Sequence, residues 1–417
     1  MGNATSEQEK EESILRNPQE GKASSFYWAC RHGDLDLVKN IFSSSKFNDI
    51  NCLELNGSTG LHAASYNGHV HVVQFLLQNG IFRHQGNRYG FTAHEEAKND
   101  EIRELFHRPT GSQRFATDTA DDTRQLFNTH VEQSTDNNET PENNWIGGAS
   151  DETSIGGFQA LCHVGKYMVT SSILRPLFMN ILRLKDYPDF AYNEKLAVEG
   201  LQRIIDNHVT SSHPEYQKAC YLLSKYDKSK QVKYLLRLYS LETPFYRHLG
   251  IDQQSHCLVT PIFFHLDTLK NRAFQGVLYR GLSMTEKDLQ PYKWALKQKE
   301  SVLMTETFCS TSVDQNVASS FSENVSENKI GVMMIFKFAK KCDTAIQLFT
   351  VSENLPGISD FENEHEVLIL PLTFFHVTNI DINKTNGQTT IYLENLRTKG
   401  GFLTLLKANW DLGNSSD

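Results

Sequence analysis

The chain has 417 residues, a hydrophobic content of 39% and a formal net charge of -9 at pH 7, enough sequence for two or three domains with a sizeable core. The acidic balance argues against an extended nucleic-acid-binding face, because such a face needs clustered Lys and Arg. No run approaches the roughly 18 apolar residues of a membrane span. The 7 cysteines are never spaced as CxxC, so we expect reduced thiols, a cytoplasmic location and no metal site.

The first 21 residues are predicted to form a flexible N-terminus. The opening "MGNATSEQEKEE" offers no apolar segment for a secretory signal peptide. Met1, Gly2 and Ser6 fit the MGxxxS pattern for myristoylation of Gly2. Acidic residues follow, and one acyl chain anchors only weakly. Weak membrane association through Gly2 therefore stays open beside the cytoplasmic location.

Residues 22–108 contain a repeat with a spacing of about 33 residues. The segment "ACRHGDLDLVKNIF" aligns with "ASYNGHVHVVQFLL", and "GSTGLHAA" aligns with "GFTAHEEA". Ala63 and Ala64 are small enough for close helix packing, and Val70, Val73 and Leu76 form an apolar stripe. The pattern resembles ankyrin repeats, which implies a stack of three helical repeats with a protein ligand.

The amino-acid composition changes twice in the remaining sequence. Residues 109–144 are rich in Thr, Asn and Asp, which predicts a flexible acidic linker. Residues 145–410 carry helical stripes up to about 275, then short β-branched and aromatic runs typical of strands. We therefore predict an α+β domain with a helical lobe and a mixed β-core, followed by a tail at 411–417. The predicted strands are "GVLYRGL", "GVMMIFKF", "AIQLF", "HEVLIL", "FFHVTNIDI" and "QTTIYLEN".

Three motifs lie on the predicted strands in a fixed order. The first is "LYRGLS" around Arg280, and the second is "FCSTSVDQNVASSF" with Ser310 at the end of a strand. The third is "SDFENEHEVLILP", with glutamates at alternate positions 362, 364 and 366. In an extended chain these three carboxylates share one side and repel one another. The pattern indicates either a solvated edge or a site that needs paired carboxylates.

Together the motifs resemble the R-S-E signature of arginine-specific mono-ADP-ribosyltransferases over residues 145–410. The resemblance implies a glycosyltransferase that moves ADP-ribose from NAD, its co-substrate, to arginine side chains of a protein. It implies that Arg280 binds the pyrophosphate beside Tyr279, for which a planar guanidinium fork is suited. It further implies that Gly281 approaches the nicotinamide amide, Ser310 orients the catalytic carboxylate and Phe321 stacks on the nicotinamide ring.

The resemblance gives the three glutamates different roles. Glu366, directly before "VL", is expected beside the NAD ribose, where a carboxylate stabilises the oxocarbenium-like transition state. Glu364 is expected to hold and partly deprotonate the acceptor arginine. Glu362 lies outside the family pattern and is expected to be a solvated loop charge, and His365 is expected to face away from both catalytic groups.

Two alternatives remain open from the sequence. The first is an NAD glycohydrolase, in which water replaces the arginine acceptor. The second is a non-catalytic ankyrin scaffold whose C-terminal domain only binds NAD or ADP-ribose. In the leading interpretation, the ankyrin repeats select the protein target, whose identity the sequence does not give.

Overall fold

The computed structural model describes residues 23–109, 194–245 and 256–396, with gaps at 298–302, 306–307, 323–328, 353, 372 and 384–386. The predicted flexible N-terminus with Gly2, the linker from residue 110 onward and the tail lie outside the described residues. The described residues form two compact units. Unit 1 contains 23–109, 204–230 and 237–244; unit 2 contains 194–203, 231–236 and the described residues from 245 to 396.

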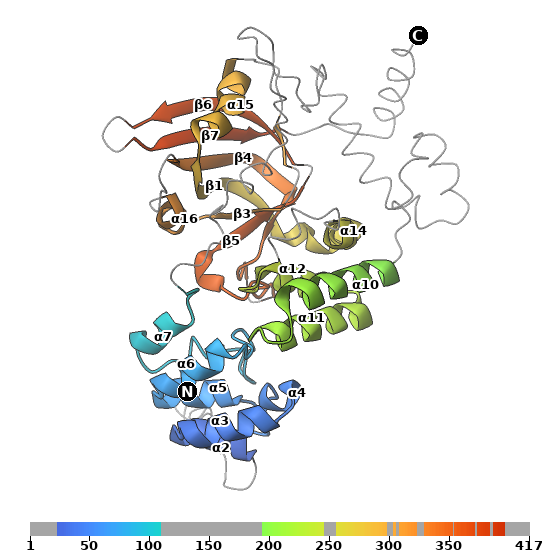
Figure 1. Cartoon of the computed structure of the whole chain (residues 1–417), viewed down its shortest axis with the longest axis vertical. Helices are drawn as coiled ribbons and strands as arrows, with labels where there is room; N and C mark the ends of the chain where they lie inside the picture. The colour runs from blue at the N-terminus through green and yellow to red at the C-terminus, as the bar shows by residue number, and fades with distance from the viewer. Residues whose placement is uncertain are drawn as a thin grey trace, which may run out of the picture. The chain divides into compact units, whose positions relative to one another are not determined.

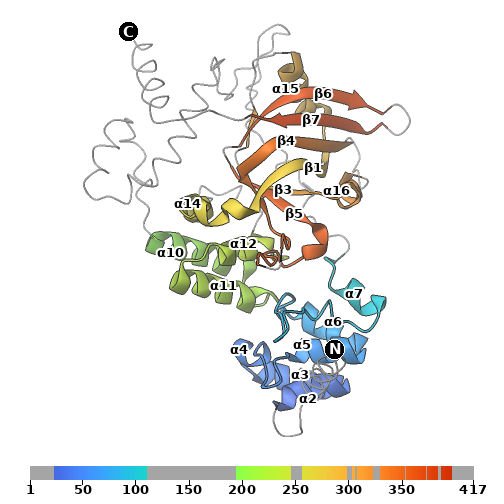
Figure 2. The ribbon, with the colours of Figure 1, turned by 180° about the vertical axis from the view of Figure 1, so that it is seen from behind.

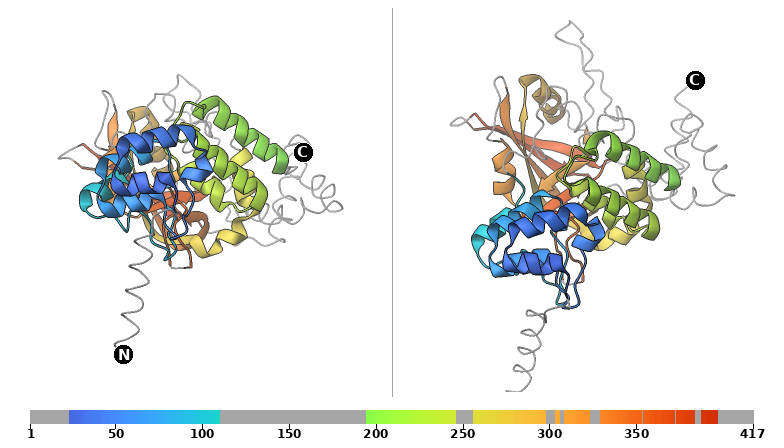
Figure 3. Two further views of the ribbon diagram at one scale, coloured as in Figure 1. Left: turned by 90° about the horizontal axis from the view of Figure 1, so that it is seen from below. Right: turned by 60° about the horizontal axis from the view of Figure 1, so that its bottom comes forward.

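Unit 1 begins with short helices arranged as packed pairs (Figures 1 and 3). Helix α2 packs on α3 and α5, and α6 packs on α5, α3 and α7. Ser24, Asp34 and Thr59 accept hydrogen bonds from backbone N–H groups of the following turns and so cap three of these helices. The helices are α2 (Ser25–His32), α3 (Leu35–Ser44), α4 (Phe47–Ile50), α5 (Gly60–Asn67), α6 (Val70–Gln78) and α7 (Asp100–Leu105).

Small residues explain the close packing of these helices. Ala29, Ala64 and Val73 are fully or almost fully buried in one apolar cluster. A Cβ on Gly60 would lie 2.9 Å from the Phe26 ring. A larger residue at position 60 therefore requires the two helices to move apart.

A later part of the chain also belongs to unit 1. It contains the π-helix η4 (Ile205–Val209), α11 (Tyr216–Ser229) and the end of α12 (Lys233–Ser240). The Tyr221 ring of α11 lies 5.0 Å from the Phe82 ring and 5.9 Å from the Phe47 ring, measured between centroids. Segments 204–230 and 237–244, which the sequence places in the C-terminal domain, thus pack with the repeats.

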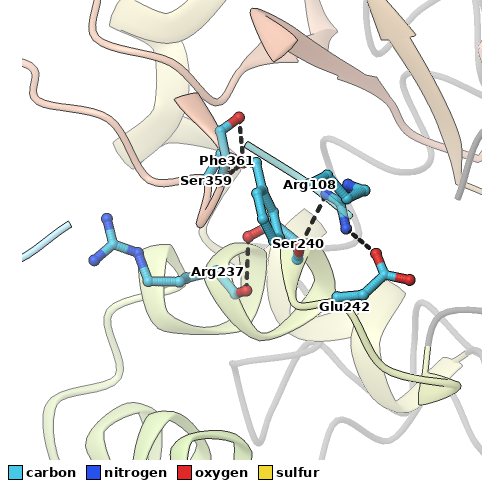
Figure 4. A network of polar contacts seen from close by, with 6 residues as sticks. All are labelled: Arg108, Arg237, Ser240, Glu242, Ser359 and Phe361. Atoms are coloured by element: carbon cyan, nitrogen blue, oxygen red, sulfur yellow. Dashed lines mark hydrogen bonds and ion pairs between the residues drawn. The ribbon is translucent and has the colours of Figure 1, made fainter. Parts of the chain in front are cut away.

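Polar contacts reinforce this packing at the end of the repeats (Figure 4). The Arg108 side chain is buried, forms an ion pair with Glu242 and donates a hydrogen bond to the Ser240 carbonyl at 3.3 Å. The Ser240 hydroxyl donates to the carbonyl of Arg237 at 2.8 Å. The last repeat is therefore tied to the end of α12.

Unit 2 is an α+β unit built on one sheet, as the sequence predicts (Figure 2). The sheet order is β1-β3-β5-β4-β7-β6-β2, and β1 also pairs with β4. All of these pairs are antiparallel except β4 with β7. The strands are β1 (Ala273–Met284), β2 (Leu303–Met304), β3 (Cys309–Ser312), β4 (Ile330–Gln347), β5 (Glu366–Ile369), β6 (Phe374–Ile382) and β7 (Thr389–Asn395).

The helices of unit 2 precede or interrupt the strands. Helix α16 contacts β1, β3 and β4, whereas α15 contacts β6 and β1. The predicted strand "AIQLF" is not separate, because its first three residues complete the long strand β4. The helices are α10 (Glu194–Ile204), the first part of α12, α14 (His256–Phe264), η5 (Leu266–Arg272), α15 (Glu286–Lys297), α16 (Gln315–Ser322) and η6 (Glu362–Glu364).

The core of unit 2 lies under α15 on one face of the sheet. Leu278 and Leu282 of β1 and Phe336 of β4 bury their side chains there with Tyr292 of α15. The two-residue spacing within each strand places these side chains on the same face. The intervening residues of β1, β3 and β5 point to the opposite face.

Candidate functional site

The three sequence motifs come together on neighbouring strands. Tyr279 of β1 lies opposite Ser312 of β3, and Ser312 lies opposite Glu366 of β5. Residues directly opposite in antiparallel strands share a face of the sheet. Tyr279, Ser312 and Glu366 therefore form a row across the face of the sheet opposite the apolar core under α15, and Figure 2 shows β1, β3 and β5 in this part of the sheet.

Arg280 occupies a different environment from this row. It lies opposite Met334, a residue of the apolar core, so the pleat turns it to the other face of β1 from Tyr279. The residue is 6% exposed, and its Nη1 donates to the Ser310 carbonyl at 2.6 Å. Its Nε is buried without a hydrogen-bond partner among the described residues. Such a donor fits an anionic ligand, and pyrophosphate binding by Arg280 stays a prediction.

The charge of Arg280 affects its buried neighbours. Burial raises the pKa of the Tyr292 phenol and of the Cys309 thiol, and the nearby guanidinium opposes both shifts. Both side chains therefore stay neutral at physiological pH. Cys309 is consequently a packing residue of the core rather than a nucleophile.

Ser310 and Ser312 lie on the same face of β3 and make different contacts. Ser310 lies opposite Leu368, two residues beyond Glu366, and its carbonyl accepts from Arg280. Ser312 lies opposite Glu366, and its hydroxyl donates to the Glu364 carbonyl at 2.7 Å. Ser312 is not among the residues that the sequence predicts for the site, and the role predicted for Ser310 stays a prediction. Alternation puts both serines on one face, and only the register with β5 distinguishes them.

The expected alternation of the glutamates is wrong. Glu362 and Glu364 lie in the 3-10 turn η6, and His365 has a left-handed backbone with φ of 44°. The strand begins only at Glu366, so the two-residue periodicity does not extend back to Glu362. Glu364 is 4% exposed and Glu366 is 0% exposed, which excludes a solvated edge for these two carboxylates. His365 is exposed, with its ring 5.5 Å from that of Phe349.

The structure also corrects the expectation for Glu362. Its side chain is half-buried, and its Oε2 accepts a hydrogen bond from the Thr350 hydroxyl at 2.9 Å. A Cβ on Gly357 would lie 1.9 Å from the Oε1 of this carboxylate. Glu362 therefore contacts the preceding loop and is only partly exposed to water.

For Gly281 and Phe321, the two remaining predicted site residues, the structure gives only part of the surroundings. Gly281 is buried and lies opposite Met333 of β4, on the face that carries Tyr279. Phe321 lies in the last turn of α16, but its side chain is outside the described residues. Their predicted contacts with nicotinamide stay predictions. In the described residues, no cluster of three His, Cys, Asp or Glu side chains is arranged to bind a metal, and no helix could span a membrane.

Comparison with known families concerns the N-terminal region. A family model of ankyrin repeats in 3 copies matches residues 26–106, which confirms the predicted repeats. Inversin from Danio rerio is 37% identical over 71 residues, covering 17% of this chain and 7% of that protein. Serine/threonine-protein kinase TNNI3K from Mus musculus is 48% identical over 52 residues, covering 12% and 6%, respectively. The chain thus spans only a small fraction of these relatives, and their activities are not transferred to it.

Similar solved structures cover about half of the chain. The type III effector XopAI from Xanthomonas axonopodis pv. citri matches 55% of this chain and 100% of its own, with 15% identity and a TM-score of 0.36. Vis toxin, an ADP-ribosyltransferase from Vibrio splendidus, matches 50% and 89%, with 18% identity and a TM-score of 0.26. HopU1, an ADP-ribosyltransferase of Pseudomonas syringae pv. tomato, matches 47% and 87%, with 13% identity and a TM-score of 0.31. TM-scores this low carry no argument about this chain.

Proposed function

We propose that unit 2 transfers ADP-ribose from NAD to arginine side chains of a protein substrate and releases nicotinamide. The observation that carries this proposal is the convergence of three distant motifs on β1, β3 and β5. Tyr279, Ser312 and Glu366 form one row, and Arg280 reaches the backbone of the same β3 segment. If the three short motifs were present by chance, they would not need to lie on neighbouring strands.

Each proposed residue has a distinct chemical task. Glu366 stabilises positive charge on the ribose as the bond between C1′ and the nicotinamide nitrogen breaks, and nicotinamide leaves with the electron pair. Glu364 accepts a proton from the acceptor guanidinium as its nitrogen bonds to C1′. Arg280 supplies a permanent positive charge, and pyrophosphate binding by its unpartnered Nε requires the dinucleotide to reach the opposite face of β1 from Glu366. Ser312 holds the backbone of Glu364 through the hydrogen bond to its carbonyl.

The burial of Glu364 favours a second candidate function. A carboxylate in a residue that is only 4% exposed is reached more easily by water than by a protein arginine. NAD hydrolysis, with water as the acceptor, is therefore the alternative outcome. Nicotinamide release that is indifferent to arginine supports hydrolysis, and release that needs arginine supports transfer.

The test is to incubate the full chain with labelled NAD, with and without a basic protein, and to measure nicotinamide release and protein labelling. We expect Glu366→Ala to lower both by about 100-fold or more, as for loss of one preorganised electrostatic group. We expect Glu364→Gln to lose arginine transfer and keep some hydrolysis. Glu394→Gln, on β7 beside Lys337, is the matched control and should retain activity.

Two results would contradict the proposal. A wild-type protein that neither releases nicotinamide nor labels the acceptor would exclude both transfer and hydrolysis. Calorimetric titration with NAD would then test the scaffold alternative. A Glu364→Gln variant that modifies arginine normally removes the acceptor role from Glu364.

A further inference from the structure

A buried arginine outside the predicted motifs binds the loop that leads to the candidate glutamates. Arg272, the last residue of η5, donates from Nη1 to the carbonyls of Gln347 and Phe349, both at 3.2 Å. Its Nη2 donates to the carbonyl of Pro356. One planar guanidinium therefore joins the start and the end of the loop at 348–358, which a point charge such as lysine does not reproduce.

The loop is also closed by its own backbone. The N–H groups of Ile358 and Ser359 donate to the Leu348 carbonyl at 2.6 and 2.9 Å. The Leu348 N–H donates to the carbonyl of Glu366 at 2.9 Å. The base of the loop is thus hydrogen-bonded directly to the backbone of the proposed catalytic residue. Figure 4 shows the chain just after the loop, where Phe361 and Ser359 hydrogen-bond to each other.

Glu362 completes the arrangement from the other side. Its carboxylate accepts from Thr350, whose hydroxyl accepts from the Gly357 N–H at 2.9 Å. Burial lowers the pKa of Arg272, and the negative charge of Glu362 raises it. The two charges therefore hold the same short loop by separate contacts, one with its carbonyls and one with its Thr350 hydroxyl.

We infer that Arg272 is a positioning residue for the proposed reaction: by fixing loop 348–358, it sets where Glu364 and Glu366 meet the ribose and the acceptor. This inference rests on the proposed function. It concerns the geometry of the carboxylates and not NAD binding, since Arg272 reaches the site only through the loop. Loss of Arg272 should therefore lower kcat and leave KM for NAD nearly unchanged.

The experiment compares full-length wild type with Arg272→Lys, Arg272→Ala and the control Lys270→Ala, an exposed residue of the same helix. We expect Arg272→Lys and Arg272→Ala to reduce kcat for nicotinamide release by about 10- to 100-fold, the scale of a small misplacement of a catalytic group. KM for NAD should stay within about twofold. In hydrogen exchange, the amides of Ile358 and Ser359 should exchange at least about tenfold faster than in wild type.

A second variant keeps the inference testable if the substitutions at position 272 prevent folding. Gly357→Ala places a Cβ 1.9 Å from the Glu362 carboxylate, so it disturbs the same loop from the other side and should also lower kcat with KM unchanged. Wild-type kcat and wild-type exchange in Arg272→Lys would overturn the inference. A wild-type protein inert toward NAD would instead overturn the proposed function, and hydrogen exchange alone would then decide whether Arg272 fixes the loop.

Discussion

At the scale of single residues, the decisive feature is the backbone of His365. Its left-handed φ of 44° separates Glu364, in the 3-10 turn, from Glu366, in the strand. A regular strand would place both carboxylates on one face at fixed spacing. The turn instead sets their relative orientation by backbone conformation, so the placement of the two carboxylates depends on the backbone of His365.

The first prediction concerns this backbone conformation. His365→Val should lower the free energy of unfolding by about 1–3 kcal/mol, because a β-branched side chain is strained at positive φ. His365→Gly should stay within about 1 kcal/mol of wild type, because glycine adopts this region freely. Thermal denaturation measures both, and His376→Val on strand β6 is the control for the added valine. Equal effects of Val and Gly at position 365 would argue against a left-handed backbone there.

A second residue-scale prediction concerns the turn that opens α5. His62 Nδ1 lies 2.8 Å from the Thr59 hydroxyl, and its Nε2 lies 3.0 Å from the Phe91 carbonyl. Burial lowers the pKa of His62 to about 4 from 6.5. The unfolded chain binds this proton first, so stability falls as the pH drops from about 6.5 towards 4. The neutral ring, with one donor and one acceptor, matches both partners.

The measurement compares wild type with His62→Gln by urea denaturation, followed through tryptophan fluorescence, to which Trp28 of the same repeats contributes. The difference in the free energy of unfolding between wild type and His62→Gln should fall by about 2 kcal/mol between pH 7.5 and pH 5, at about 1.4 kcal/mol per pKa unit. A difference in the free energy of unfolding that stays constant over this range would mean that His62 has the same pKa in the folded and unfolded states.

At the scale of elements, local patterns predict which segments form helices and strands but not how they pair. The runs around Arg280 and Glu366 were recognisable as strands because β-branched and aromatic residues dominate them. The choice of Ser312 over Ser310 opposite Glu366 depends on the register between β3 and β5, which no local pattern carries. The 3-10 turn before β5 was missed for a related reason, since alternating glutamates are equally compatible with a strand.

Helix α11 shows the same limit on a larger element. Its apolar stripe predicts a helix, but nothing in the stripe indicates that Tyr221 packs with Phe47 and Phe82 of the repeats. Association between segments so distant in sequence is a tertiary property. The predicted domain boundaries, drawn from changes in composition, therefore stay predictions.

The element-scale prediction tests how the repeats are tied to the end of α12. Arg108→Ala removes the buried ion pair with Glu242 and the bond to the Ser240 carbonyl (Figure 4). It should lower the free energy of unfolding of unit 1 by about 1–3 kcal/mol, because a charge-assisted contact of a buried guanidinium and its hydrogen bond to a backbone carbonyl are lost. The control Asp227→Ala removes a more exposed pair with Lys230 in the same unit and should cost less than about 0.5 kcal/mol. Equal urea midpoints for the two variants would show that the Arg108 contact contributes nothing.

At the scale of the whole molecule, the chain combines ankyrin repeats with a unit that carries the candidate catalytic row. Ankyrin repeats lack any group proposed here for chemistry, so their contribution is expected in partner choice. Large apolar side chains are exposed on the loops between their helices: Leu55 is 73% exposed and Phe91 is 48% exposed. Exposed aromatic and aliphatic side chains on loops are suited to contact a protein partner.

The last prediction separates partner choice from chemistry. In the full chain, the double substitution Leu55→Asp and Phe91→Asp should reduce labelling of protein acceptors by about tenfold, because it removes apolar contact area and adds charge where a partner would dock. The rate of nicotinamide release with free arginine as acceptor should be unchanged, because neither residue belongs to the catalytic row. Leu196→Asp, at a leucine that is 57% exposed and lies outside the repeats, is the control. A parallel loss of both activities would indicate that the substitutions disturb folding, and an unchanged ratio of protein to free-arginine labelling would show that these loops do not select the target.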